Sequence, residues 1–248
     1  ERKRRRQPKR RTEKYERQET YSMKWIKRLC SFIFLCILII GGILTYQGYT
    51  DYRKALEAKS VEEMAAEIES IDNYTALDSL PQTYIDAVLS VEDKRFYSHP
   101  GIDPIAIGRA LVINIRAGAY VEGGSTITQQ LAKNQYFTQD KKIVRKIAEM
   151  FMAFKIEAVL DKDKILELYV NSIFFGNNYY CVGDASIGYF GKLPSEMNFD
   201  ECTMLAGIPN APSNYNPQAS PELARQRQAQ VIEKMKKAGY LESEEENQ

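Results

Sequence analysis

The sequence predicts a mainly α-helical domain that is preceded by a single N-terminal transmembrane helix. Apolar residues recur at helical spacing through most of residues 53–237, whereas the alternation typical of β-strands is scarce. Residues 29–46 form a run of 18 residues without a charged side chain. A run of that length is at the lower end of what crosses a bilayer as a helix.

The charge is unevenly distributed along the 248 residues. Residues 1–28 contain 13 Lys or Arg against 4 Asp or Glu, whereas the remaining residues contain 21 against 29. The sequence therefore predicts a basic arm joined to a mildly acidic body. Ordinary globular composition, 44% hydrophobic and 27% charged, excludes a disordered chain. The single histidine excludes a metal site built from several imidazoles.

The flanks of the apolar run predict its direction in the membrane. All 13 basic residues of the arm precede the run, and only Arg53 and Lys54 follow it closely. By the positive-inside rule, the arm is cytoplasmic and residues 47–248 lie outside the cell membrane. A basic arm can also bind nucleic acid, but its place next to a span favours contact with anionic lipid headgroups. We therefore expect membrane lipids, and no nucleic acid, as partners of the arm.

Helical periodicity and capping residues divide the body into predicted segments. Residues 47–71 read as a helical stalk, 72–240 as one domain, and 241–248 as an acidic tail. Asp103 followed by Pro104 predicts a helix start, and Gly239 predicts a helix end. Cys181 and Cys202 lie outside the span, where a disulfide is permitted but not implied. The helices expected in the body are 53–71, 81–91, 104–116, one with Ser125 as its candidate N-cap, 141–160, 162–171, 181–190, 199–208 and 221–237.

Three local features could carry chemistry, and each also has a structural explanation. Glu92 ends an apolar helix and could be a partly desolvated base, or simply a solvated terminal acid. The segment 123–126, Gly-Gly-Ser-Thr, could bind an anion at a helix N-terminus, or only cap that helix. Arg145 and Glu149 are four residues apart and share a helix face, where a solvated salt bridge is the simpler interpretation. His99, beside Pro100 and Gly101, is more often structural than catalytic.

Five motifs in order give these features a common explanation. They are EDKRFYSHPG (92–101), GGSTITQQ (123–130), RKIAE (145–149), KDKILELYVN (162–171) and RQAQVIEKM (227–235). Together they resemble the motifs of the peptidoglycan glycosyltransferases, the family of monofunctional transglycosylases and of the glycosyltransferase module of class A penicillin-binding proteins. The likeness covers about residues 80–240.

The resemblance implies a lysozyme-like glycosyltransferase fold and a role in building the bacterial cell wall. The expected reaction is inverting transfer of a lipid-pyrophosphate-linked glycan to the C4 hydroxyl of an acceptor lipid II. By resemblance, Glu92 is the general base, and Glu149 assists at the leaving pyrophosphate. The residues expected to hold phosphate and sugar groups are Ser125, Gln130, Lys133, Lys141 and Arg145. The apolar stretch 105–122 matches a region that the family presses into the bilayer.

The resemblance also implies ligands and partners. Glu149 could bind a divalent cation, Mg²⁺ or Mn²⁺, because a carboxylate beside a pyrophosphate is repulsive unless a cation lies between them. No organic cofactor is expected. The expected partners are lipid II, the growing glycan strand and other proteins of wall synthesis and division. Two alternatives remain: a lysozyme-like lytic enzyme acting on peptidoglycan, and a catalytically silent scaffold of wall assembly.

Overall fold

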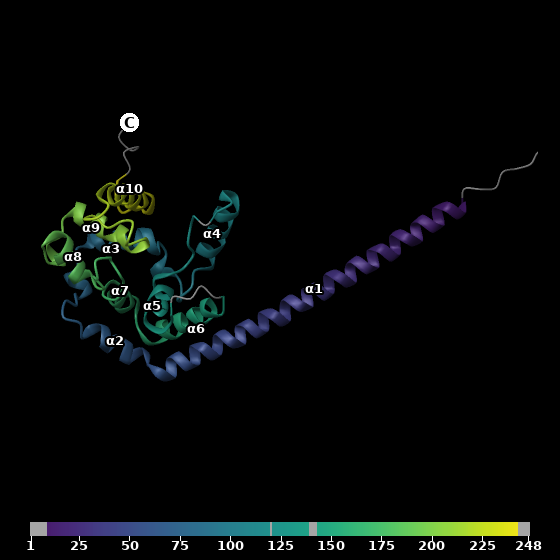
Figure 1. Cartoon of the computed structure of the whole chain (residues 1–248), viewed down its shortest axis with the longest axis horizontal. Coiled ribbons are helices and arrows are strands. Elements are labelled where there is room, and N and C mark those ends of the chain that lie inside the picture. The colour runs from purple at the N-terminus through teal and green to yellow at the C-terminus, as the bar shows by residue number, and fades with distance from the viewer. Residues whose placement is uncertain (1–8, 120, 139–142, 243–248) are drawn as a thin grey trace, which may run out of the picture. The chain divides into compact units, whose positions relative to one another are not determined.

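The computed structural model describes residues 9–119, 121–138 and 143–242, with side chains from residue 25 onward (Figure 1). Its contacts divide the chain into two units, Glu1–Gln47 and Gly48–Gln248. Lys141 and Lys142 lie outside the described residues, so the predicted role of Lys141 in binding stays a prediction.

The first helix, α1, runs from Lys9 to Ala58 and passes through the boundary between the two units. Within the described residues, the stretch Trp25–Ala58 is the one that is long and apolar enough to cross a membrane. Nearly all its large apolar side chains between Leu29 and Ile43 are exposed, as lipid-facing side chains would be. The structure therefore contains the single N-terminal apolar helix that the sequence predicts.

The second unit is built from helices, which confirms the predicted fold class. Among the described residues no strand occurs, and the single bridge pairs Gly176 with Tyr179. Four short 3₁₀ turns, at 77–79, 96–98, 194–196 and 208–210, connect the longer helices. Those helices are α2 (Val61–Glu69), α3 (Gln82–Glu92), α4 (Pro104–Ala117), α5 (Ile127–Tyr136), α6 (Ile143–Val159), α7 (Lys162–Val170), α8 (Val182–Phe190), α9 (Phe199–Gly207) and α10 (Pro221–Ala238).

Two groups of helices enclose the core of this unit. Helix α3 packs against α9 and α10, and α5 packs against α6 and α7 (Figure 1). Completely buried side chains such as Tyr84, Leu131, Tyr169 and Leu205 fill the space that these helices share. Helix α4 differs, because Ala110 is its one buried residue while Ile105, Leu111, Ile115 and others are exposed. These exposed apolar side chains exclude a fully buried α4.

The segment predicted as a stalk is partly built into the core. Val61, Met64 and Ile68 of α2 are buried among the core residues, so residues 61–69 belong with the body and not above it. A capping box at Ser60 starts this helix. At the end of α1, a Cβ on Gly48 would lie 2.6 Å from a methyl carbon of Ile147, so glycine permits α1 and α6 to touch there.

The caps explain where the helices around the site begin and end. Asp103 accepts the N–H groups of Ile105 and Ala106 at 2.9 and 3.0 Å, which confirms the predicted start of α4. Gly239 ends α10 with a φ of 86°, as predicted. The N-cap prediction for Ser125 is wrong. Thr126 caps α5 and forms a capping box with Gln129, because its hydroxyl is the one that reaches the N–H of Gln129.

Candidate active site

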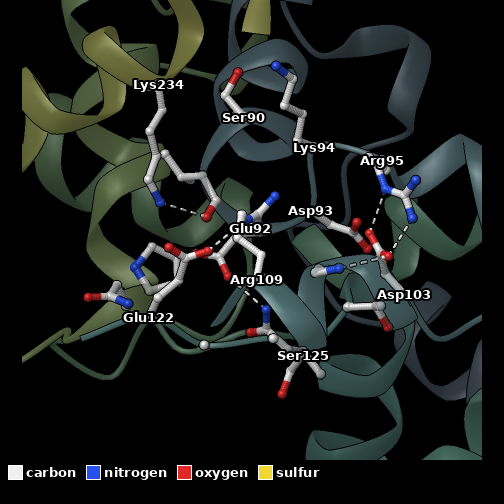
Figure 2. Close-up of a pocket in the computed structure, with 18 of the residues that line it drawn as sticks. Ser90, Glu92, Asp93, Lys94, Arg95, Asp103, Arg109, Glu122, Ser125 and Lys234 are labelled. Atoms are coloured by element: carbon white, nitrogen blue, oxygen red, sulfur yellow. Dashed lines mark hydrogen bonds and ion pairs between the residues drawn. The ribbon is translucent and has the colours of Figure 1, made fainter. Parts of the chain in front are cut away.

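A cavity of about 520 Å³ opens between the C-terminal end of α3, the start of α5, the inner side of α4 and helix α10. Residues 121–126 line it as well, and Figure 2 labels Glu122 and Ser125 among them. Gly124 lets this loop approach α4, since a Cβ there would lie 3.0 Å from the Cα of Ile107. The charged side chains that line the cavity are Glu92, Asp93, Lys94, Arg95, Asp103, Arg109, Glu122, Lys133, Arg227, Lys234 and Lys237.

Glu92 is the last residue of α3 and is half-buried at this cavity. Its carboxylate accepts a hydrogen bond of 2.7 Å from the side-chain amide of Gln130, on the first turns of α5. Figure 2 shows Glu92 between Lys234 and Ser125 in this view. A carboxylate that is held by one hydrogen bond and still borders a cavity can accept a proton from a bound hydroxyl group.

Two lysines border the same cavity as Glu92, Lys133 half-buried and Lys234 more exposed. Burial lowers the pKa of Lys133 on α5, and the nearby Lys146 and Arg145 lower it further, although Glu149 and Glu92 oppose this. Burial also lowers the pKa of Lys234 on α10, and Arg227 adds to that effect. Among the described residues, the side chain of Lys133 has no hydrogen bond or ion pair, so its ammonium is available to an anion.

A line of polar contacts leads from the cavity to Glu149. The hydroxyl of Ser125 accepts a hydrogen bond of 2.7 Å from Lys146, whose ammonium is also 2.8 Å from a Glu149 oxygen. The other Glu149 oxygen lies 2.8 Å from the Nε of Arg145. Glu149 is completely buried. The solvated salt bridge considered from the sequence is therefore not what Glu149 forms, and its carboxylate fixes the two cations on α6.

The binding of a divalent cation by Glu149 stays a prediction. Mg²⁺ and Mn²⁺ require several oxygen ligands. Both Glu149 oxygens lie 2.8 Å from a cation, that of Arg145 or of Lys146, and Oε1 has no hydrogen-bond partner among the described residues. One group of described residues has metal-ligand spacing, namely Asp93, His99 and Asp103. Its groups already have partners, since His99 pairs with Asp93 at 2.9 Å and Asp103 pairs with Arg95. We therefore derive no step through a metal.

Asp93, His99 and Asp103 form a buried scaffold, and Asp93 and Asp103 also border the cavity. Asp93 accepts the backbone N–H of Ile127 at 3.1 Å and so holds the start of α5 against the end of α3. Arg95 lowers the pKa of Asp103 to about 2, with help from the two N–H groups at the start of α4. These contacts fix the three segments that carry Glu92, Gln130 and the cavity loop. His99 is structural, as its sequence context favours.

The structure gathers most, but not all, of the residues predicted from the sequence. Glu92, Ser125, Gln130 and Lys133 line one cavity. Arg145 and Glu149 lie behind it and reach it through Lys146 and Ser125, as described above. The sequence reasoning missed other charged residues that line the cavity, and these are Lys94, Arg95, Arg109, Glu122, Arg227, Lys234 and Lys237. Four of them, Lys94, Arg95, Arg227 and Lys234, belong to the quoted segments 92–101 and 227–235, which were the available indication of their place.

The comparison with known proteins agrees with this geometry. The family model described as Transglycosylase matches residues 59–236, which is most of the chain. The chain belongs to this family. The transglycosylase domain begins at residue 59 and therefore includes α2, in keeping with the burial of that helix. The prediction of a peptidoglycan glycosyltransferase family from the five motifs is confirmed.

Individual relatives of this transglycosylase domain fall into two length classes. It is similar to penicillin-binding protein 1A of Aquifex aeolicus, with 47% identity over 69% of this chain and 24% of the relative. It is also similar to penicillin-binding protein 1F of Bacillus subtilis, with 37% identity over 89% of this chain and 33% of the relative. The chain thus spans a third or less of these proteins. A Cupriavidus necator protein whose name includes the word transglycosylase is 40% identical over 87% of this chain and 93% of its own length.

Proposed function

We propose that this chain polymerises lipid II into the glycan strands of peptidoglycan, with inversion at the donor sugar. The observation that carries the proposal is Glu92, a carboxylate at a cavity that also contains the unpaired, partly buried ammonium of Lys133. A glycosyl transfer from a lipid pyrophosphate needs a base at the acceptor hydroxyl and positive charge at the leaving group. Family membership supports the substrate class.

In the proposed step, Glu92 accepts the proton of the C4 hydroxyl of the acceptor lipid II. The acceptor oxygen then forms a bond to the anomeric carbon of the donor, while the bond from that carbon to the pyrophosphate oxygen breaks. The electron pair leaves with the lipid pyrophosphate, and the proton stays on Glu92. Lys133 stabilises the negative charge that develops on the pyrophosphate. In this proposal, Ser125, Gln130 and Arg145 either contact the substrate or hold the residues that contact it.

A lytic enzyme is the second candidate, and the surroundings of Glu92 disfavour it. Glycoside hydrolysis usually needs a second carboxyl group as acid or nucleophile. The other carboxylates that line the cavity are Asp93, Asp103 and Glu122, and each is paired with a cationic or imidazole partner: His99, Arg95 and Arg109.

Incubation of the purified full chain with lipid II tests the proposal directly. We expect glycan polymer from the wild-type protein and a rate about 10² to 10⁴ times lower from Glu92→Gln, the usual loss for a positioned base. Glu62→Gln, an exposed glutamate on α2, is the matched control and should polymerise normally. Fragments released from purified peptidoglycan, without polymer from lipid II, would show a lytic enzyme instead. Polymer at the wild-type rate from Glu92→Gln would exclude Glu92 as the base.

We also propose a single-pass topology with residues 1–28 in the cytoplasm and residues 47–248 outside. The basic arm before the apolar run supports it, and so does a substrate that carries a lipid. Protease added to sealed, right-side-out vesicles should digest the body and spare the arm. Digestion of the arm with an intact body would reverse the orientation.

A further inference from the structure

Tyr169 lies behind the site and contacts it through one atom. It belongs to α7 and is completely buried, with its hydroxyl group 3.3 Å from the side-chain oxygen of Gln130. Burial raises the pKa of Tyr169 well above its usual range, and the negative charge of Glu92 adds to this. The phenol therefore keeps its proton and acts as a hydrogen-bond donor at any working pH.

Gln130 connects this phenol with Glu92. A carboxylate only accepts hydrogen bonds, so the NH₂ group of the amide must face Glu92, at the observed 2.7 Å. The amide oxygen then faces the opposite way, toward the hydroxyl of Tyr169. Each end of the amide therefore has a partner of the correct polarity, and rotation by 180° about the last side-chain bond would reverse both contacts.

We propose that Tyr169 is a positioning residue for the base: its hydroxyl holds the Gln130 amide in the orientation that donates to Glu92. The inference rests on the proposed function, because it takes Glu92 to be the base. Tyr169 touches no substrate and acts only through Gln130. The contact is long for a hydroxyl donor, so we expect its loss to have a moderate effect.

Without the hydroxyl, the two orientations of the amide become closer in energy. The flipped amide presents its oxygen to the Glu92 carboxylate, which favours the protonated acid and moves the carboxylate away from the acceptor. Charged or titratable groups near Glu92 include Lys133 on α5, Lys234 on α10 and the buried phenol of Tyr84 on α3 itself. The same cavity also contains Arg109 of α4, Glu122 of the loop and Arg227 of α10. None of them contacts the Gln130 amide in the described part of the chain, so none replaces Tyr169.

Tyr84 provides a matched control. It is also completely buried, and its phenol is close enough to Glu92 for that charge to raise its pKa. Its hydroxyl has no hydrogen-bond partner among the described residues. Tyr84→Phe and Tyr169→Phe therefore remove the same atom at similar depth beside the same carboxylate, and only the second change affects the Gln130 amide.

Steady-state polymerisation of lipid II over a range of pH tests the inference. For Tyr169→Phe we expect kcat to fall about three- to tenfold. KM should change little, and the acid limb of the pH–rate profile should move to higher pH. Tyr84→Phe should retain the wild-type profile. On a Gln130→Leu background, Tyr169→Phe should add no further loss. Equal melting temperatures of the two phenylalanine variants would show that the difference is not one of folding.

The outcomes separate this inference from the proposed function. If Glu92→Gln is inactive but Tyr169→Phe matches Tyr84→Phe in kcat and pH profile, Tyr169 does not position the base, and the proposed function stands. If Tyr169→Phe also loses activity on the Gln130→Leu background, its effect does not pass through the amide, and the inference fails. If Glu92→Gln remains fully active, the proposed function fails first.

Discussion

Glu92 and Asp93 are consecutive acids at the end of α3, yet their surroundings are opposite. Glu92 is half-buried at a cavity and has one amide donor. Asp93 is buried, pairs with His99 through both oxygens and accepts the N–H of Ile127. The difference arises because Asp93 leaves the helix with a φ of −158° and turns its side chain inward.

The comparison separates two tasks that adjacent residues perform. The scaffold formed by Asp93, His99 and Asp103 has its charges matched inside the protein, so it should contribute to folding more than to rate. At the cavity, the charges of Glu92 and Lys133 remain available to a bound substrate. Changes to the first should lower stability, and changes to the second should lower turnover.

Substitution of Glu149 should have the largest effect. It tests whether one residue can serve both stability and turnover. Its removal leaves the cations of Arg145 and Lys146 uncompensated behind the cavity, and loss of one partner of a buried pair costs about 3 kcal/mol or more. We expect Glu149→Ala to lower both the free energy of unfolding and turnover. Because both oxygens already face cations, stimulation by Mg²⁺ or Mn²⁺ should remain in the folded fraction. Loss of that stimulation alone would assign Glu149 to a metal.

Lys133→Ala should affect the rate most among the changes on the cavity side. An ammonium at the leaving pyrophosphate acts mainly on the transition state, and loss of such a group typically lowers kcat by about 10². Binding of lipid II should weaken much less, and thermal unfolding should change little, since Lys133 has no ion pair among the described residues. A loss of affinity as large as the loss of kcat would show ground-state binding instead. Lys155→Ala, which changes a half-buried lysine on α6, is a suitable control.

Asp93→Asn should lower stability more than turnover, which is the reverse of the effect of Lys133→Ala. The substitution keeps the volume but removes the charge that pairs with His99, and a buried hydrogen bond to a charged group is worth about 2 kcal/mol. For a domain of this size, the melting temperature should fall by roughly 4–8 °C. The rate per folded molecule, measured well below the transition, should fall less than for Glu92→Gln. An Asp93→Asn protein with wild-type melting and no activity would contradict the division of tasks.

Asp103→Asn should lower stability by a similar amount, and its effect should depend on pH. The pKa of Asp103 is lowered to about 2 in the folded protein, below its unfolded value near 3.8. Its contribution to stability, roughly 2 kcal/mol, is therefore fully present above about pH 4 and is lost as the pH falls toward 2. Urea unfolding of wild type and variant should differ at pH 7 and converge as the pH approaches 2. A constant difference across this range would indicate that the charge of Asp103 contributes nothing.

The sequence alone determined the helical fold class, the apolar N-terminal helix and the motif residues that are candidates for the site. These features depend on contacts between near neighbours: periodicity, Asp103 before Pro104, and Gly239 after the last turn of α10. Glu92 could be selected as the base because it ends an apolar helix within a segment that matches a family motif.

The tertiary structure decided which polar side chains meet. Gln130 and Glu92 are 38 residues apart, Tyr169 and Gln130 are 39 apart, and Lys94 and Lys237 are 143 apart. No local pattern distinguishes Lys234 or Tyr169 from similar residues on the same helices. The burial of Glu149 was also undecided, because an i, i+4 pair looks the same whether its face meets water or protein. Helix formation depends on neighbours along the chain, whereas the environment of a charge depends on the packing of distant segments, and that packing exists only in the folded protein.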